Sequence, residues 1–338
     1  IAPWLLALYA VAFLGALFAV ASWGDAAAAR GRVLHFGGWV YALSLAVHCT
    51  SWAYYGTVGQ AAALGWPLPP TYVGVIALYL LLPALLYKLI TASQRERVSS
   101  VADFVAARFG RDRALAVAVT FIATCGVIPY IALQLKAIDQ SFMALAVPAA
   151  LSSPAGDTSL YVAATLAVFA ILFGARHVDA TEHHPGMMLA LAFGAVLKLA
   201  AFVAVGVFVT WGLFDGFGDL AARTRAIEGL EAARALQSST TRYLALAVLG
   251  FCAIFCLPWQ FHVGVVEARG PRDLRLARFA FPIYLLAISL FILPIASAGL
   301  VLGGLGAISL VAALLLFDAR NLAVRVRLDA SEEPLMLR

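Results

Sequence analysis

Hydrogen-bonding side chains crowd into one apolar segment, AVHCTSWAYYGTVGQAAALGWPLPP, which begins at Ala46. His48, Cys49, Thr50 and Ser51 are consecutive there, and a Gly-x-x-Gly pattern follows them. Hydroxyl, imidazole and exposed backbone groups of this kind can bind a cation or a small polar solute. The spacing therefore raises the question of whether this stretch is a regular helix or a broken one.

A helix that unwinds in hydrocarbon leaves backbone N–H and C=O groups unpaired, at a cost of several kcal/mol each. Secondary transporters nevertheless break helices near the bilayer midplane, where carbonyl oxygens meet sodium and helix ends meet solutes. If this segment is broken in that way, Gly56 and Gly59 lie in the unwound part. The alternative is an intact helix whose Ser and Thr hydroxyls bond to the preceding turn, and the residues alone slightly favour it.

Two other segments carry charged or amide side chains at membrane depth. Lys198 lies three to four helical turns past Pro185, near the bilayer midplane, and no acidic residue stands four positions from it. A lysine at that depth needs a partner from another helix or an aqueous cavity. Gln134 precedes Lys136 and Asp139, whose spacing favours a mutual pair near the outer interface over a role in solute binding.

The segment GARHVDATEHHPGMM, residues 174–188, contains three histidines. A zinc site in it would combine His177 with His183 or His184. Their spacing does not place them on one helix face, and no glutamate stands in an H-E-x-x-H position. We therefore predict a polar turn before a helix that begins near Pro185, with metal binding as a minor alternative.

A proline interrupts the segment CLPWQFHVGVVEARG, which begins at Cys256. Pro258 is predicted to open the helix backbone. Gln260, His262 and Glu267 come after it and approach the cytoplasm. An ordinary solvated helix end is the expected setting for Glu267 more than for Gln260.

No catalytic pattern accompanies these groups. The sequence has no Gly-rich phosphate loop, no paired catalytic carboxylates and no nucleophile triad, so we predict no enzyme activity and no organic cofactor for these residues. All four cysteines lie in apolar segments and are predicted to be core thiols. They are Cys49, Cys125, Cys252 and Cys256.

The amino-acid composition indicates whether this chain is surrounded by water or by lipid. Of 338 residues, 63% are apolar and 12% charged, whereas a soluble domain is about half apolar and about a quarter charged. We therefore predict an all-α polytopic protein in a lipid bilayer. The net charge of +5 does not indicate nucleic-acid binding, because the basic residues lie in short loops. About nine transmembrane helices are predicted, at 2–22, 36–58, 71–92, 114–147, 159–175, 186–214, 243–266, 279–302 and 304–317.

Arginines concentrate in alternate loops, namely those after the first, third, fifth, seventh and ninth predicted spans. By the positive-inside rule these loops face the cytoplasm, so the N-terminus lies outside and the C-terminus inside. In the third loop, Ser99 or Ser100 is predicted to cap a short surface helix that Gly110 ends. On the outer side, residues 215–242 are predicted to form a surface helix, or else a solvated linker.

The order of these motifs carries more information than any one of them. In sequence, ALSLAVHCTSWAYYGTVGQAA, VSSVADFVAARFG, IPYIALQLKAI, FGARHVDATEHHPGM and LPWQFHVGVVEARGPRDLRLARFAFPIYLL resemble the sodium:solute symporter family. More closely, they resemble the symporter-like membrane region at the N-terminus of bacterial sensor histidine kinases. The resemblance covers roughly residues 1–302. It implies the bacterial inner membrane, with a periplasmic N-terminus, and a partial inverted-repeat (5+5) fold of sodium-coupled transporters.

The resemblance also implies site residues. It implies that the helix over residues 46–59 is broken and that backbone oxygens near Ala46 and Cys49 line a sodium position. Sodium would be the coupling ion and the solute a small organic, amino-acid-like compound. The implied solute-facing residues are Thr50, Ser51, Trp52 and Tyr54, with Gln134 and Gln260 as weaker candidates.

Residues 303–338 depart from the family pattern and read as an atypical short helix and a cytoplasmic tail. The eighth core helix of the family supplies hydroxyls that complete the sodium site, whereas this stretch offers only Ser309. We count eight core helices where the fold has ten, and the start at Ile1 suggests a piece of a longer protein.

Three functions fit these observations: sodium-coupled uptake, solute sensing for a kinase domain in the full-length protein, or a degenerate fragment with neither activity.

Overall fold

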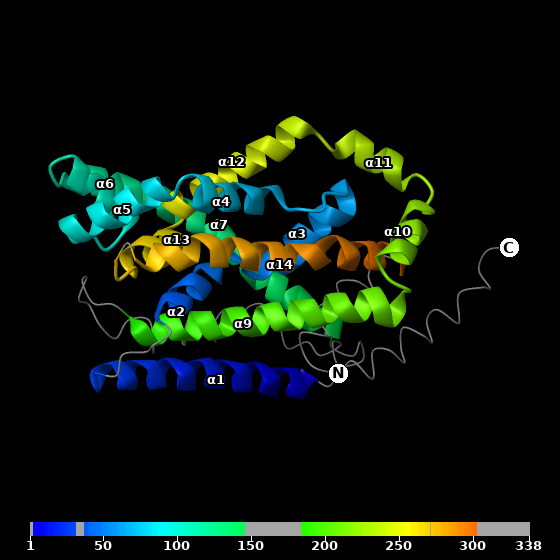
Figure 1. Cartoon of the computed structure of the whole chain (residues 1–338), viewed down its shortest axis with the longest axis horizontal. Helices are drawn as coiled ribbons and strands as arrows, with labels where there is room; N and C mark the ends of the chain where they lie inside the picture. The colour runs from blue at the N-terminus through cyan, green and yellow to red at the C-terminus, as the bar shows by residue number, and fades with distance from the viewer. Residues whose placement is uncertain (1–2, 32–36, 146–183, 271, 303–338) are drawn as a thin grey trace, which may run out of the picture.

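The computed structural model describes residues 3–31, 37–145, 184–270 and 272–302, and every regular element within these ranges is a helix (Figure 1). The first half contains α1 (Pro3–Ala29), α2 (Gly37–Ser44), the 3₁₀ turn η1 (Leu45–His48), α3 (Ser51–Leu64), α4 (Pro70–Leu81), α5 (Pro83–Glu96), α6 (Val101–Arg108) and α7 (Arg113–Leu145). The second contains α9 (Pro185–Val207), the π-helical turn η3 (Phe208–Leu213), α10 (Phe217–Arg225), α11 (Leu230–Gln237), α12 (Thr240–Cys256), α13 (Pro258–Phe261), the π-helical turn η4 (His262–Val266) and α14 (Asp273–Val301).

Within the described ranges, four helical segments are long and apolar enough to cross a membrane: Trp4–Ala29, Arg113–Ile138, Pro185–Leu213 and Asp273–Val301. Two bent pairs, α4 with α5 and α11 with α12, raise the number to six if each pair is one span. The described part of the chain is thus all-helical with membrane-length elements, as its composition predicted. The spans at 159–175 and 304–317 lie outside the described residues, so the count of nine stays a prediction.

The span over residues 71–92 is two helices, so the expectation of a single helix there is wrong. α4 ends at Leu81, α5 begins at Pro83, and the two are bent by 80°. Leu82 between them has φ −123° and ψ 42°, which is not helical. Pro83 has no N–H to donate to the preceding turn, and its ring is tolerated at the start of a helix but not inside one.

α14 is the centre of the helical assembly and packs against α2, α3, α4, α9 and α10 (Figure 1). Its largest fully buried side chains recur every three or four positions, as expected for a helix that turns one face to a core; they are Phe281, Leu285, Ile288, Ile292 and Ile295. α1 lies at the edge against α9, where Asp25 Oδ1 accepts a 2.8 Å hydrogen bond from the Gly186 amide. Among the helices that α14 contacts, α3, α4 and α9 carry residues of the site described below.

Two glycines bring α4 and α12 into backbone contact. A Cβ atom on Gly74 would meet the Ala247 carbonyl and lie 2.6 Å from the Phe251 nitrogen. A Cβ on Gly250 would meet the Thr71 carbonyl and lie 2.6 Å from the Thr71 Cα. Small residues at helix contacts allow this close approach in membranes. As a result, residues of α4 and α12 can share one wall of a cavity.

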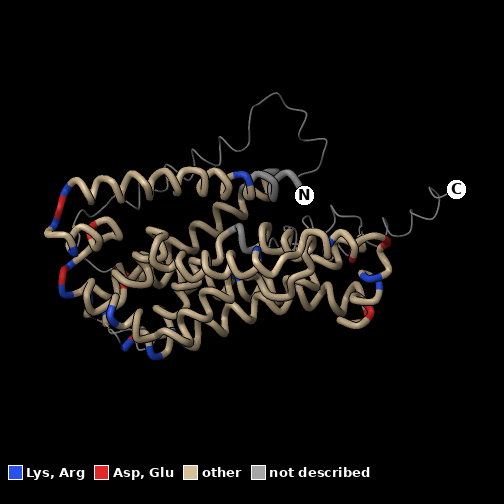
Figure 2. Tube along the Cα trace, turned by 90° about the horizontal axis from the view of Figure 1, so that it is seen from above, with Lys and Arg blue, Asp and Glu red and all other residues tan. Residues whose placement is uncertain are grey.

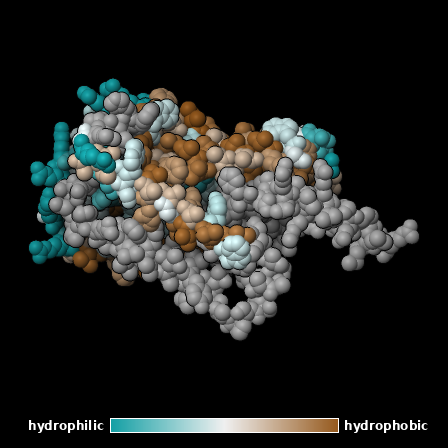
Figure 3. All heavy atoms as spheres, turned by 90° about the horizontal axis from the view of Figure 1, so that it is seen from below, coloured by the Kyte–Doolittle hydropathy of each residue, from teal (hydrophilic) through white to brown (hydrophobic). Residues whose placement is uncertain are grey.

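Hydrophilic and charged residues gather at the ends of the molecule. Lys and Arg residues are most frequent at the end formed by α5 and α6 (Figure 2), and apolar side chains cover much of the middle of the face in Figure 3. At the basic end, Ser100 caps α6 by accepting a 3.1 Å hydrogen bond from the Asp103 amide, which confirms the predicted short helix and its cap. At the other end, the predicted surface helix over 215–242 is two short helices, α10 and α11.

Candidate solute site at two helix breaks

The first break lies between α2 and α3. After Ser44 the chain tightens into the 3₁₀ turn η1, and Thr50 is extended with φ −87° and ψ −170° before α3 starts at Ser51. The predicted break is therefore present, but it lies one to two turns earlier than the Gly-x-x-Gly pattern. Gly56 and Gly59 lie inside the regular helix α3, so their predicted unwinding is wrong.

The two carbonyl groups predicted to line a sodium ion belong to this first break. Ala46 and Cys49 are completely buried. The Ala46 carbonyl accepts a 2.9 Å hydrogen bond from the Cys49 amide, which closes the 3₁₀ turn. The Cys49 carbonyl accepts a 3.0 Å hydrogen bond from Nζ of Lys198 on α9. No acidic partner for Lys198 stands on its own helix, and its hydrogen-bond partner is the Cys49 carbonyl at the first break.

The second break lies between α12 and α13. Leu257 is extended with φ −79° and ψ 120°, and α13 begins directly after it at Pro258, which confirms the predicted opening. The short α13 contacts η1 of the first break. Two interrupted helices, distant in sequence, therefore meet at their interruptions.

α7 joins the two breaks through one tyrosine. The Tyr130 hydroxyl donates a 2.8 Å hydrogen bond to Oγ1 of Thr50 at the first break. The Tyr130 ring stacks on Trp259 after the second break, with centroids 4.6 Å apart and planes 23° from parallel. Stacked and edge-on aromatic pairs contribute about 0.5–1.5 kcal/mol beyond their buried area, so Tyr130 fixes both breaks relative to α7.

These residues line a cavity of about 240 Å³. Hydroxyl groups come from Thr50, Thr57 and Thr71, and aromatic or imidazole rings from His48, Tyr72, Tyr130 and Trp259. The remaining wall is apolar and belongs to α12 and the second break, with Leu249, Gly250, Ala253 and Leu257. No carboxylate, lysine or arginine lines it among the described residues. The cavity thus combines hydroxyl groups and aromatic faces without a full charge.

The predicted solute-facing residues divide between the cavity and its surroundings. Thr50 lines the cavity. Tyr54 is buried and packs its ring on Phe202 of α9, with centroids 5.4 Å apart, and its hydroxyl has no hydrogen-bond partner among the described residues. Ser51 and Trp52 begin α3, and their side chains lie outside what the structure describes.

The two glutamines do not line the cavity. Gln134 lies one helical turn beyond Tyr130 on α7 and is partly buried. Gln260 lies on α13, is fully buried, and neither atom of its side-chain amide has a hydrogen-bond partner among the described residues. A buried polar group without a partner costs about 1–3 kcal/mol, so Gln260 is a candidate for a water, ion or solute contact next to the break.

Glu267 is not at a solvated helix end, and that expectation is wrong. Its side chain is 1% exposed and accepts a 3.1 Å hydrogen bond from the His184 backbone amide. Burial alone would raise the pKa of Glu267, but hydrogen bonds from His262 and His184 outweigh it and lower the pKa to about 2. The carboxylate is therefore ionised at neutral pH, enclosed by two histidines.

Several cavity residues were not singled out from the sequence: Thr57, Thr71, Tyr72, Tyr130 and Trp259. Two of them carried a usable signal, since each aromatic follows a proline directly, in Pro129-Tyr130 and Pro258-Trp259. Prolines interrupt helix hydrogen bonding in membranes and often mark sites. For the residues on α4, spacing in the sequence gave no indication of contact with α12.

No protein-family model, curated protein or solved structure matches this chain. Its function must therefore be inferred from the geometry of the two breaks and from the resemblance of its motifs.

Proposed function

We propose that this chain is a membrane domain that binds a small organic solute where two broken helices meet, as the solute-binding part of a transporter or of a membrane sensor. One observation carries the proposal: a cavity is lined from both breaks, and Tyr130 of a third helix bonds to one and stacks on the other. Paired interruptions in the two halves of a transporter fold mark its binding site. The inverted-repeat fold and the membership in the symporter family are part of this proposal.

The lining favours a small, uncharged or zwitterionic solute. Three threonine hydroxyls can hydrogen bond to a polar group, while Tyr72, Tyr130 and Trp259 offer aromatic faces. A cavity of about 240 Å³ is smaller than the roughly 300–1,000 Å³ of sites for drug-sized ligands. Amino-acid-like compounds, which the motif resemblance implies, fit both the size and the chemistry.

At the first break the contacts favour Lys198 as the resident cation. Its ammonium lies 3.0 Å from the Cys49 carbonyl, one of the two oxygens that the resemblance assigns to sodium. Carbonyl groups at the end of a helical segment attract positive charge, whether from an ion or from a side chain. Lys198 therefore supplies a fixed cation next to the proposed solute site, at the position where the resemblance implies sodium.

Transport and sensing would share this binding step and differ in the step after it. A kinase domain in the full-length protein would read solute occupancy, whereas a transporter would release the solute on the other side. Uptake into proteoliposomes distinguishes the two, because a domain that only senses binds solute without accumulating it.

The orientation in the bacterial inner membrane is testable by labelling. In a variant without the native cysteines, single cysteines at Ser99 and Arg272 should react with a membrane-impermeant maleimide only from the cytoplasmic side. A cysteine at Ala226, which is exposed between α10 and α11, should react only from the periplasm. The expectation rests on the basic residues around α5 and α6. Labelling of Ala226 and Ser99 from the same side would contradict it.

Solute binding should depend on Trp259 and Tyr130. With a panel of L-amino acids as probes, we expect at least one to raise the melting temperature of the purified chain saturably. Trp259→Ala removes a wall of the cavity and the stack on Tyr130, and should weaken that binding by about tenfold or more, since buried aromatic anchors cost at least 1–2 kcal/mol when truncated. Tyr130→Phe keeps the stack but loses the hydrogen bond to Thr50, and should cost about 1 kcal/mol, or about fivefold.

Tyr87→Phe is the matched control for these variants. Tyr87 is on α5, is 52% exposed and does not line the cavity, so its hydroxyl should not affect solute binding. If Trp259→Ala and Tyr87→Phe bind the same amino acid as tightly as the unmodified chain, the cavity is not the solute site.

A further inference from the structure

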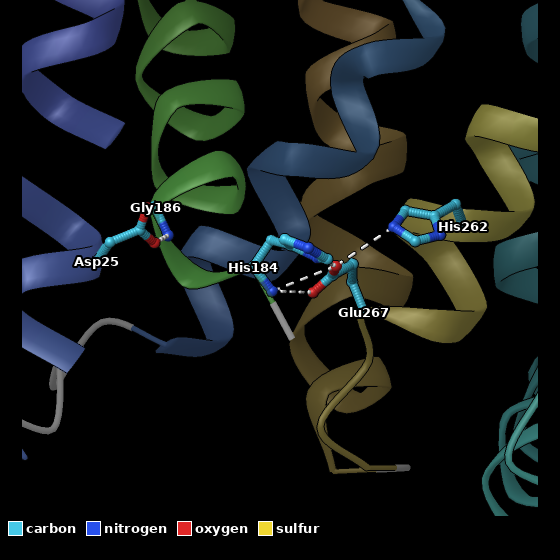
Figure 4. Close-up of polar contacts among 5 residues, drawn as sticks. All are labelled: Asp25, His184, Gly186, His262 and Glu267. Atoms are coloured by element: carbon cyan, nitrogen blue, oxygen red, sulfur yellow. Dashed lines mark hydrogen bonds and ion pairs between the residues drawn. The ribbon is translucent and has the colours of Figure 1, made fainter. Parts of the chain in front are cut away.

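Two histidines and a glutamate from distant parts of the sequence meet at the basic end of the molecule (Figure 4). His184 directly precedes α9, His262 starts η4, and Glu267 comes directly after η4. His184 Nδ1 lies 2.9 Å and His262 Nε2 lies 3.3 Å from the same carboxylate oxygen, Oε1 of Glu267. All three candidate ligand atoms lie within 4.8 Å of one another.

We propose that His184, His262 and Glu267 form a binding site for a divalent transition-metal ion, with Zn²⁺ as the best-fitting case. A tetrahedral zinc ion, with bonds of about 2.0–2.2 Å to nitrogen and oxygen, places its ligand atoms about 3.3–3.5 Å apart. The 2.9 Å and 3.3 Å separations already approach this geometry. To complete it, the 2.9 Å separation must lengthen slightly and the two histidine nitrogens, which lie within 4.8 Å of each other, must reach the same spacing.

The chemistry of the donor set supports a metal over a purely structural cluster. Two imidazoles and one carboxylate are zinc ligands, and this combination leaves the fourth position to water or another molecule. The carboxylate is 1% exposed, while the histidines are 39% and 36% exposed. The anionic ligand is thus buried inside the protein, and the two imidazole ligands are partly accessible to solvent.

Hydrogen bonds from the surrounding helices hold the anionic ligand in place. The His184 backbone amide donates to both carboxylate oxygens of Glu267, at 3.3 Å and 3.1 Å. On either side of Glu267, Gly264 accepts a hydrogen bond from the Tyr41 hydroxyl at 2.6 Å, and Ala268 accepts one from the Gln94 amide at 2.9 Å. Such partners orient metal ligands and raise affinity.

The ion would connect the start of α9 with the end of η4. α9 carries Lys198, and the α13–η4 segment carries Trp259, so both connected elements lead to the cavity. A bound metal would therefore hold the start of α9 and the end of η4 together. The metal site itself does not rest on the proposed solute binding and is tested without any solute.

The test is Zn²⁺ binding to the purified full chain in detergent, without a polyhistidine tag. We expect one Zn²⁺ per chain by competition with a fluorescent zinc indicator, and a saturable rise in melting temperature. His262→Gln and Glu267→Gln each remove one ligand and should weaken binding by at least about tenfold, because even the loss of a group that only orients a ligand costs about 10–100-fold. Cys256→Ser, which removes an exposed thiol outside the cluster, should leave binding unchanged.

Co²⁺ distinguishes this site from adventitious binding to cysteine. The unmodified chain should give visible d–d bands without a thiolate-to-cobalt charge-transfer band. In a variant without the four native cysteines, His184→Cys keeps three ligands and should add that charge-transfer band, a gain of signal that no other thiol can supply. Equal Zn²⁺ affinity of the unmodified chain and His262→Gln, or a thiolate band before any cysteine is introduced, overturns the proposal.

Discussion

Lys198→Met should lower the free energy of unfolding by about 1–3 kcal/mol, because it leaves the buried Cys49 carbonyl without its 3.0 Å hydrogen-bond donor. Methionine keeps most of the length and apolar volume of the lysine stem, so the change isolates the ammonium group. Thermal unfolding in detergent measures the effect. The same variant should lose solute binding, because the first break loses the contact that fixes it to α9.

The role of Lys198 as the resident cation makes a second, independent measurement possible. In the unmodified chain, replacing Na⁺ by K⁺ at constant ionic strength should change neither the melting temperature nor solute binding. Lys88→Met is the matched control, since Lys88 on α5 is exposed and should tolerate the loss of its charge. A saturable stabilisation of the unmodified chain by Na⁺ alone would show that an ion, and not Lys198, completes the break.

The sequence predicted an apolar, all-helical chain with most of its long helices, because these features depend on local composition. The break near Cys49 was implied only by the resemblance of the motifs, whereas the residues alone slightly favoured an intact helix. The sequence placed the unwinding at Gly56 and Gly59, but glycine in a helix costs only about 1 kcal/mol and tertiary packing easily overrides it. The actual break at Cys49 and Thr50 is stabilised by contacts from Lys198 and Tyr130. Those contacts join residues 149 and 80 positions apart, which no local pattern encodes.

The cluster of His184, His262 and Glu267 illustrates the same limit. Sequence spacing compared His184 with its neighbours His177 and His183, both of which lie outside the described residues, and gave no metal site. The partners that the structure supplies are 78 and 83 positions away, as the numbering gives. The direction of the Glu267 pKa shift could not be predicted from the sequence either, because burial raises that pKa and the two histidine contacts lower it.

Packing at the contact between α4 and α12 leads to the prediction with the largest effect on folding. Gly74→Ala should lower the free energy of unfolding by about 1–3 kcal/mol or more, the usual range for overpacking a filled contact. The added Cβ would meet the Ala247 carbonyl and lie 2.6 Å from the Phe251 nitrogen. These are backbone atoms, so no side-chain rotation relieves the overlap and the two helices must separate.

Gly59→Ala is the control that separates this clash from the general effect of glycine in a helix. Gly59 lies in the regular part of α3, and a Cβ there meets no atom within 4 Å. Alanine should therefore stabilise α3 by up to about 1 kcal/mol through helix propensity, the opposite sign to Gly74→Ala. Both are measured by thermal unfolding in the same detergent, and a Gly74→Ala chain at least as stable as the unmodified one would contradict the close contact. Because Thr71, Tyr72 and Gly250 line the cavity from these two helices, separation of α4 from α12 should also widen the cavity and weaken solute binding, whereas Gly59→Ala should leave both intact.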